Sequence, residues 1–148
     1  MLLDDEQAAI NELVAACRET ADHYEDAAGQ LDDAALGELF ARLREARLGT
    51  VESLCRIVRA SGELPRAAPA DKEHFDQLVT RVKAVFSPDS RTPFLDARIE
   101  DERRLTQLAD EALALGLAAE SRDCVEALRA QTSDALARLE DVRRRASG

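Results

Sequence analysis

The chain has 148 residues, of which 45% are hydrophobic, 34% are charged and 3% are aromatic. This length and apolar content fit one compact domain, residues 1–148, with its own core. The formal net charge of -10 disfavours contact with a phosphate backbone, because nucleic-acid affinity depends on Lys and Arg displacing counterions. We therefore expect no nucleic-acid partner.

No stretch of the sequence indicates a membrane protein. Residues 1–6 lack a basic region and a long apolar run, and the weakly polar stretch 112–119 is too short to span a bilayer. We therefore expect a cytoplasmic protein without a membrane partner. Cys17, Cys55 and Cys124 are odd in number and have no C-x-x-C spacing, which indicates neither a disulfide framework nor a zinc site. They are expected to be small buried or half-buried residues.

The composition and the apolar periodicity predict an all-α protein. Ala, Leu, Glu and Arg are abundant and favour helices, whereas alternating runs of strand-forming residues are absent. Apolar residues recur at intervals of three and four, which is the period of one helix face. The predicted helices are, in chain order, residues 4–28, 34–61, 71–86, 93–115 and 121–145.

The first two long helices are expected to form an antiparallel hairpin, because the turn between them is short. Gly29 is predicted to end the first helix, and Asp32 and Asp33 after it are predicted to supply the N-cap of the second. The face of the first helix that is expected to be buried carries Ile10, Leu13, Val14, Cys17, Thr20, Ala21, Tyr24, Ala27 and Ala28. The corresponding face of the second carries Leu36, Phe40, Leu43, Arg47, Thr50, Leu54 and Ile57.

A long connection precedes the second pair of long helices. It contains the predicted helix 71–86, and Thr92 followed by Pro93 is expected to cap and open the next helix. Two hairpins joined by a long crossover have the connectivity of ferritin-like bundles, whereas an up-down bundle with short loops does not need such a connection. The apolar face of 71–86 either covers the end of the bundle or pairs with another copy of the chain.

The helix 93–115 carries two charged residues, Arg98 and Glu102, within its apolar stripe. The last helix is expected to bury Val125, Leu128, Thr132, Ala135, Leu136, Leu139 and Val142. When the helices are aligned, polar residues of all four long helices fall at one level. This predicted polar layer consists of Thr20, Arg47, Thr50, Arg98, Glu102 and Thr132.

Several short motifs together resemble a known family. They are Ile10-Asn11-Glu12-Leu13, Tyr24 with Ala27-Ala28, Leu39-Phe40, the stretch from His74-Phe75 to Val85-Phe86, and the acidic start of helix 93–115. In order and spacing they resemble an uncharacterised bacterial family of ferritin-like four-helix-bundle proteins. The resemblance covers nearly the whole chain and implies the ferritin-like fold with its crossover helix. It implies no activity, because that family has none established.

The polar layer departs from the metal site of ferritin-like proteins. Their di-iron centres use about four carboxylates and two imidazoles, including Glu-x-x-His motifs, and this chain has no such motif. We therefore expect no cofactor and a degenerate metal site, in which Arg47 or Arg98 pairs with Glu102. In a competing interpretation Arg98 and Glu102 form an exposed i, i+4 pair.

A metal-binding alternative uses Glu102 with Glu19 or Asp22 and Glu45, and it requires the first two helices to be rotated from the assignment above. Tyr24 is expected to be a core aromatic residue. His23 and His74 are expected to be solvated or capping side chains.

No nucleophile, base or phosphate-binding motif is recognisable, so we expect no enzyme. The sequence favours a non-catalytic helical bundle of unknown cellular role, a protein-interaction or oligomerising module whose partner is another copy or another protein. The alternative is a ferritin-like di-metal (iron) binding or oxidase protein.

Overall fold

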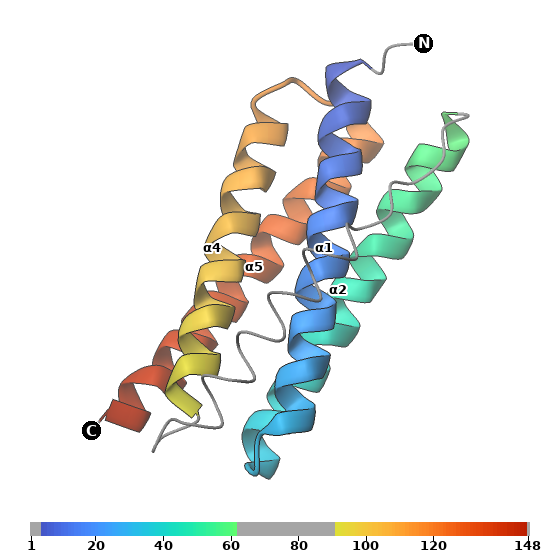
Figure 1. The fold of residues 1–148 in the computed structure, drawn as a ribbon. Helices are drawn as coiled ribbons and strands as arrows, with labels where there is room; N and C mark the ends of the chain where they lie inside the picture. Colours follow the sequence, from blue (N-terminus) through green and yellow to red (C-terminus); the bar gives the residue numbers. More distant parts are fainter. Residues whose placement is uncertain (1–3, 62–90, 148) are drawn as a thin grey trace.

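The structure is a computed structural model that describes residues 4–61 and 91–147, and these residues form four α-helices and no strand (Figure 1). The helices are α1 (Asp5–Gln30), α2 (Ala34–Ala60), α4 (Arg91–Leu113) and α5 (Ala119–Ser147). For these ranges the predicted all-α class and helical bundle are confirmed. The predicted helix 71–86, with His74, lies outside the described residues. None of the four helices carries an apolar stretch that could cross a lipid bilayer.

Side-chain caps explain where the first two helices begin. The Asp4 carboxylate accepts the backbone N–H of Gln7 at 2.7 Å, and the Gln7 side chain accepts the backbone N–H of Asp4 at 3.3 Å. This capping box satisfies two of the otherwise unpaired donors of α1. Of the two predicted capping residues, Asp33 caps α2 and accepts the backbone N–H of Leu36 at 3.0 Å. The predicted stop at Gly29 is wrong, because α1 continues to Gln30.

The start of α4 also differs from the prediction. The helix begins at Arg91, so Thr92 is already helical and is not the N-cap. Pro93 is tolerated there because the first backbone N–H groups of a helix have no partner within the helix. At the other end, α4 stops at Leu113 and is followed by Gly116 with φ 74°. This left-handed conformation favours glycine.

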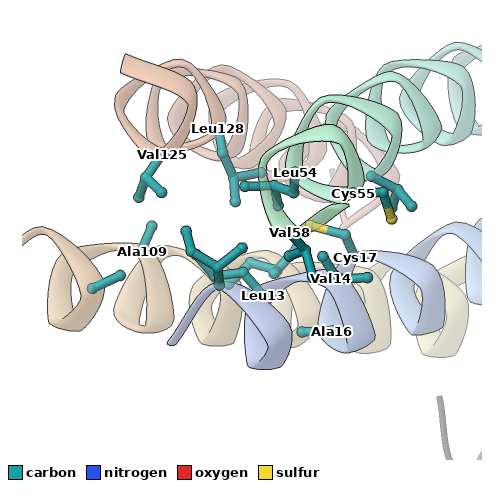
Figure 2. Close-up of a cluster of buried hydrophobic side chains, with 14 of the residues drawn as sticks. Leu13, Val14, Ala16, Cys17, Leu54, Cys55, Val58, Ala109, Val125 and Leu128 are labelled. Carbon is teal, nitrogen blue, oxygen red and sulfur yellow. The ribbon is translucent and has the colours of Figure 1, made fainter. Parts of the chain in front are cut away.

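Two apolar clusters fill the two ends of the bundle interior. The first cluster combines the first half of α1, the second half of α2, the second half of α4 and the start of α5. Figure 2 shows Leu13, Leu54, Ala109 and Val125 from these four helices converging there. The second cluster combines the opposite ends of the same helices and includes Tyr24. Thus α1 and α5 run from the first cluster to the second, and α2 and α4 run back (Figure 1).

The helix contacts define the cross-section of the bundle. α1 packs against α2 and α4, and α5 packs against α4 and α2. These four interfaces place α2 and α4 on one diagonal of the bundle and α1 and α5 on the other. The two apolar clusters do not merge along the axis, and the residues between them carry most of the buried polar side chains.

Candidate functional site

A layer of buried polar side chains lies between the two apolar clusters. Each of the six side chains of the predicted polar layer is buried, with a relative exposure of 7% or less. They come from all four helices, and several of them are joined by hydrogen bonds or ion pairs across helix boundaries. The layer residues are Thr20 on α1, Arg47 and Thr50 on α2, Arg98 and Glu102 on α4, and Thr132 on α5.

Arg47 and Glu102 form an ion pair across the bundle interior. Their side chains are 1% and 0% exposed, and Arg47 Nη2 donates to Glu102 Oε1. Because α2 and α4 lie on a diagonal, the long Arg47 side chain spans the centre of the bundle to reach its partner. Burial raises the pKa of Glu102 above its ordinary value, and the nearby Arg47 charge only partly opposes this effect.

The hydrogen bonding of this central pair is incomplete. Among the described residues, Arg47 Nε and Nη1 and Glu102 Oε2 have no partner within hydrogen-bonding distance. The Tyr24 hydroxyl has none within that distance either, yet it lies near enough to Glu102 to contribute to lowering the pKa of that carboxyl. A buried polar atom left unpaired costs about 1–3 kcal/mol. The pair therefore joins α2 to α4 but is weak evidence for stability.

Arg98 does not pair with Glu102, and the competing interpretation of an exposed i, i+4 pair is wrong, because both side chains are buried. Arg98 Nε donates to Asp101 Oδ2 at 2.9 Å, and Arg98 Nη1 donates to the backbone carbonyl of His23 at 3.3 Å. The same Asp101 oxygen lies 2.9 Å from His23 Nδ1. Arg98 thus joins α4 to α1 at the edge of the polar layer, while Glu102 faces its centre.

His23 is buried, so the prediction of a solvated or capping side chain is wrong. Its relative exposure is 6%, and it lies between Asp101 on α4 and Glu19 one turn earlier on α1. Burial acts to raise the pKa of Asp101, but the His23 hydrogen bond and the Arg98 charge outweigh it and hold that pKa below its ordinary value. Asp101 and His23 are the layer residues that the sequence did not identify. Their only signal was the i, i+3 spacing of Arg98 and Asp101.

The threonines of the layer bind mainly to helix carbonyls. The Thr20 hydroxyl donates to the carbonyl of Cys17 at 3.0 Å, and the Thr132 hydroxyl donates to that of Arg129 at 2.9 Å. Such bonds to the preceding turn are the usual arrangement of threonine inside a helix. The hydroxyls of Thr106 and Thr132 lie 2.8 Å apart and join α4 to α5.

The four carboxylates of the metal-binding alternative are not brought together. Glu45 lies on the outside of α2 with its side chain 73% exposed, 3.1 Å from Arg44. Glu19 is near His23 and Arg104 on the α1–α4 side, and Asp22 is half-buried. Burial and then the neighbouring Glu25 raise the pKa of Asp22.

The donor set of the layer does not fit a di-metal centre. Glu102 already binds a guanidinium, and Asp101 binds a guanidinium and an imidazole. Within residues 4–61 and 91–147, no group of three or more His, Cys, Asp or Glu side chains is placed to hold a metal ion. A di-iron site needs several carboxylates and imidazoles that face one another without arginine between them.

Comparison with known proteins places the chain in a family. A family model described as a domain of unknown function (DUF2383) matches residues 5–115, which include α1, α2 and α4. No curated protein and no solved structure matches the chain. Because the matched segment is well over half of the sequence, the chain belongs to the family described as a domain of unknown function (DUF2383).

Proposed function

We propose that this chain is a non-catalytic, ferritin-like helical bundle of the bacterial cytoplasm that acts through its surface, by binding another copy or another protein. In this proposal the interior layer, where ferritin-like proteins hold metal, is occupied by ion pairs of the chain's own side chains. One observation carries the interior part of this proposal. Glu102, the most deeply buried carboxylate of the described residues, is paired with Arg47, and their side chains are 0% and 1% exposed.

The chemistry of this pair argues against a metal at the same level. A cation bound to Glu102 would face the Arg47 guanidinium, which is held beside it in a region that water does not screen. Expelling Arg47 would leave a second buried charge without a partner, and that arrangement is strongly destabilising. The layer is therefore best explained as an internal structural substitute for a metal centre.

The thiol that lies next to the polar layer in the described chain is not activated, which supports a non-catalytic role. Cys17 is the thiol next to the layer, and burial raises its pKa to about 12. At neutral pH almost none of this thiol is ionised, whereas the thiolate is the reactive form.

The ferritin-like part of the proposal rests on helix directions and on the position of the layer. α1 and α5 run in one direction, and α2 and α4 run in the other. Residues 62–90 connect α2 to α4, which are parallel to each other. Ferritin-like folds share a long crossover connection and an interior functional layer at mid-height.

Elemental analysis tests the interior part of this proposal. The protein is purified from cells grown with added iron and manganese, desalted, and analysed for metal per chain. We expect far less than one equivalent, and titration calorimetry with either ion should give no tight binding. Stoichiometric, tight metal binding that is abolished by Glu102→Gln would overturn the proposal in favour of the di-metal alternative.

The surface part of the proposal needs a separate measurement. Light scattering at low and high protein concentration, followed by affinity capture with the intact chain, measures self-association and partner binding. We expect a concentration-dependent mass or a stoichiometric protein partner. A strictly monomeric protein that captures no partner at stoichiometric amounts contradicts an interaction role.

A further inference from the structure

A groove of ≈ 400 Å³ lies between the first turns of α1 and the last turns of α4. We call the exposed carboxylates that line it its rim, and the apolar residues that line it its floor. The rim is Asp5 and Glu12 of α1 and Glu111 of α4, and the floor is Leu108, Leu115, Ala8, Ala9 and Ala112. We call this groove the acidic groove. The Glu6 carboxylate, which accepts the backbone N–H of Ala118 at 2.6 Å, ties the α4–α5 loop to α1 at this end of the bundle.

The negative charge of the acidic groove is not neutralised. Asp5, Glu12 and Glu111 form no ion pair with any residue of the described chain, and Glu111 accepts only a hydrogen bond from Gln107 Nε2 at 3.2 Å. Asp5 is favoured by its place in the first turn of α1. No such local reason applies to Glu12 and Glu111, which lie further from the helix start.

A second groove shows the contrast. It measures ≈ 440 Å³ and lies between α4 and α5, where acidic and basic side chains alternate. Arg103 lies 2.6 Å from Glu100 and 3.6 Å from Glu140, and Arg143 lies 2.8 Å from Asp96. Its charges are matched within the chain, whereas those of the acidic groove are all of one sign.

The floor of the acidic groove adds an apolar surface. Leu115 is 48% exposed, and no other large hydrophobic side chain of the described chain is exposed to that degree. Leu108 is half-buried and packs against the first apolar cluster. An apolar floor between carboxylates is complementary to a helix that presents apolar residues flanked by Lys or Arg.

A second copy of this chain is a poor occupant. Its net charge is -10, so two copies repel each other at long range. Its basic cluster at the end of α5 is already engaged, since Arg143 pairs with Asp96 and both Arg144 and Arg145 pair with Asp141.

We infer that the acidic groove docks an amphipathic segment of another protein, whose apolar face covers Leu108 and Leu115 and whose basic residues pair with Glu12 and Glu111. This inference rests on the proposed function, because it names the kind of partner that a surface-acting bundle takes. Salt weakens the docking, because the rim carboxylates are exposed to solvent.

Fluorescence anisotropy of a labelled model helix tests this inference with the full chain. The probe is a designed amphipathic peptide of Leu and Lys, and a Leu and Glu peptide of the same pattern is its counterpart. We expect the Lys peptide to bind and the Glu peptide not to bind. Glu12→Lys with Glu111→Lys should weaken binding about tenfold or more, equivalent to about 1.4 kcal/mol.

A matched control separates the groove from the overall charge. Glu52→Lys with Glu126→Lys makes the same change in net charge on exposed positions of α2 and α5 outside the groove. This variant should bind within about twofold of wild type. Leu115→Ala should also weaken binding, and thermal melting of each variant verifies that the bundle stays folded.

Three results would overturn the groove inference. They are equal weakening in the groove and control variants, no weakening in Leu115→Ala, and no binding of the Lys peptide to wild type. If another part of this chain covers the groove, the Lys peptide will likewise not bind, and that result also overturns the inference.

Metal analysis of the same preparation distinguishes failure of the groove inference from failure of the proposed function. One bound metal ion or more per chain contradicts the proposed function. A metal-free protein that does not bind the Lys peptide contradicts only the groove inference.

Discussion

Arg47 on α2 and Glu102 on α4 pair across the diagonal of the bundle, with side chains that are 1% and 0% exposed. The pair lies between two apolar clusters and leaves two guanidinium nitrogens and one carboxylate oxygen without a partner in the described chain. Desolvation of both charges opposes their attraction, so we expect the pair to add little to the net stability of the bundle.

Breaking this pair should be far more damaging than replacing it. Arg47→Met or Glu102→Leu alone should lower the free energy of unfolding by about 3–5 kcal/mol, because each leaves a buried charge unpaired. The double variant should recover most of that loss and come close to wild type or exceed it by about 1–4 kcal/mol. Urea denaturation of the four proteins measures this cycle. If the loss in the double variant equals the sum of the losses in the two single variants, Arg47 and Glu102 do not stabilise each other as a pair.

The exposed pair of Arg42 and Glu38 is the control for that cycle. Its side chains are 68% and 65% exposed, and its atoms lie 2.6 Å apart on one face of α2. Solvent screens such a pair, so Arg42→Met should change the free energy of unfolding by less than about 1 kcal/mol.

Asp101 should make the protein sensitive to acid. Its pKa in the folded state lies below the ordinary value of 3.8, so its stabilising contribution is present above that value and is lost as pH falls through the folded pKa. The stability difference between wild type and Asp101→Asn should be largest near neutral pH and shrink below about pH 4. Denaturation of both proteins across this range measures it, and a constant difference would contradict the assignment. Asp123→Asn, on an exposed part of α5, should show no such trend.

The Tyr24 hydroxyl should matter much less than the Tyr24 ring. The ring is fully buried, and its centroid lies 5.5 Å from that of the Phe40 ring. The hydroxyl has no partner within hydrogen-bonding distance among the described residues, and its effect on Glu102 is a lesser contribution than that of Arg47 to lowering the pKa of that carboxyl. Tyr24→Phe should therefore change the free energy of unfolding by less than about 1 kcal/mol. Tyr24→Ala should lower it by about 3–5 kcal/mol, because it leaves a cavity in the second apolar cluster. Thermal or urea unfolding distinguishes the two, and a large loss in Tyr24→Phe would reveal a hydrogen bond.

The three cysteines should react in an order set by burial. Cys17 is buried with a pKa raised to about 12, Cys55 is buried, and Cys124 is half-buried with a pKa that burial also raises. With iodoacetamide at about pH 8, Cys124 should be alkylated first, and Cys17 only when the protein unfolds. Intact mass and peptide mapping measure this order, with urea-unfolded protein as the control. Rapid native labelling of Cys17 would contradict its burial.

Helical periodicity predicted the buried faces of the helices, although it did not predict the burial of His23. The stripes read from the sequence placed Thr20, Arg47, Glu102 and Thr132 on inward faces, and all are buried in the bundle. This works because a helix repeats every 3.6 residues, so the spacing of apolar residues specifies which face is turned inward without knowledge of its neighbours.

Some local features were not readable from the sequence. The helix α1 continues through Gly29, and α4 begins before Pro93. Glycine and the first-turn position of proline both tolerate helical geometry, so neither residue specifies a boundary by itself.

The partners within the polar layer were decided only by the tertiary structure. The sequence left open whether Arg47 or Arg98 binds Glu102, and it did not reveal that Asp101 and His23 would meet across α1 and α4. Periodicity specifies the rotation of one helix about its axis. Which side chains meet also depends on the position of each helix along the bundle axis and on which helices it contacts. Both are set when the two apolar clusters pack. The sequence by itself therefore determined a helical bundle with a buried polar layer. The packing of α2 diagonally opposite α4 decided that Arg47, and not Arg98, forms the ion pair with Glu102.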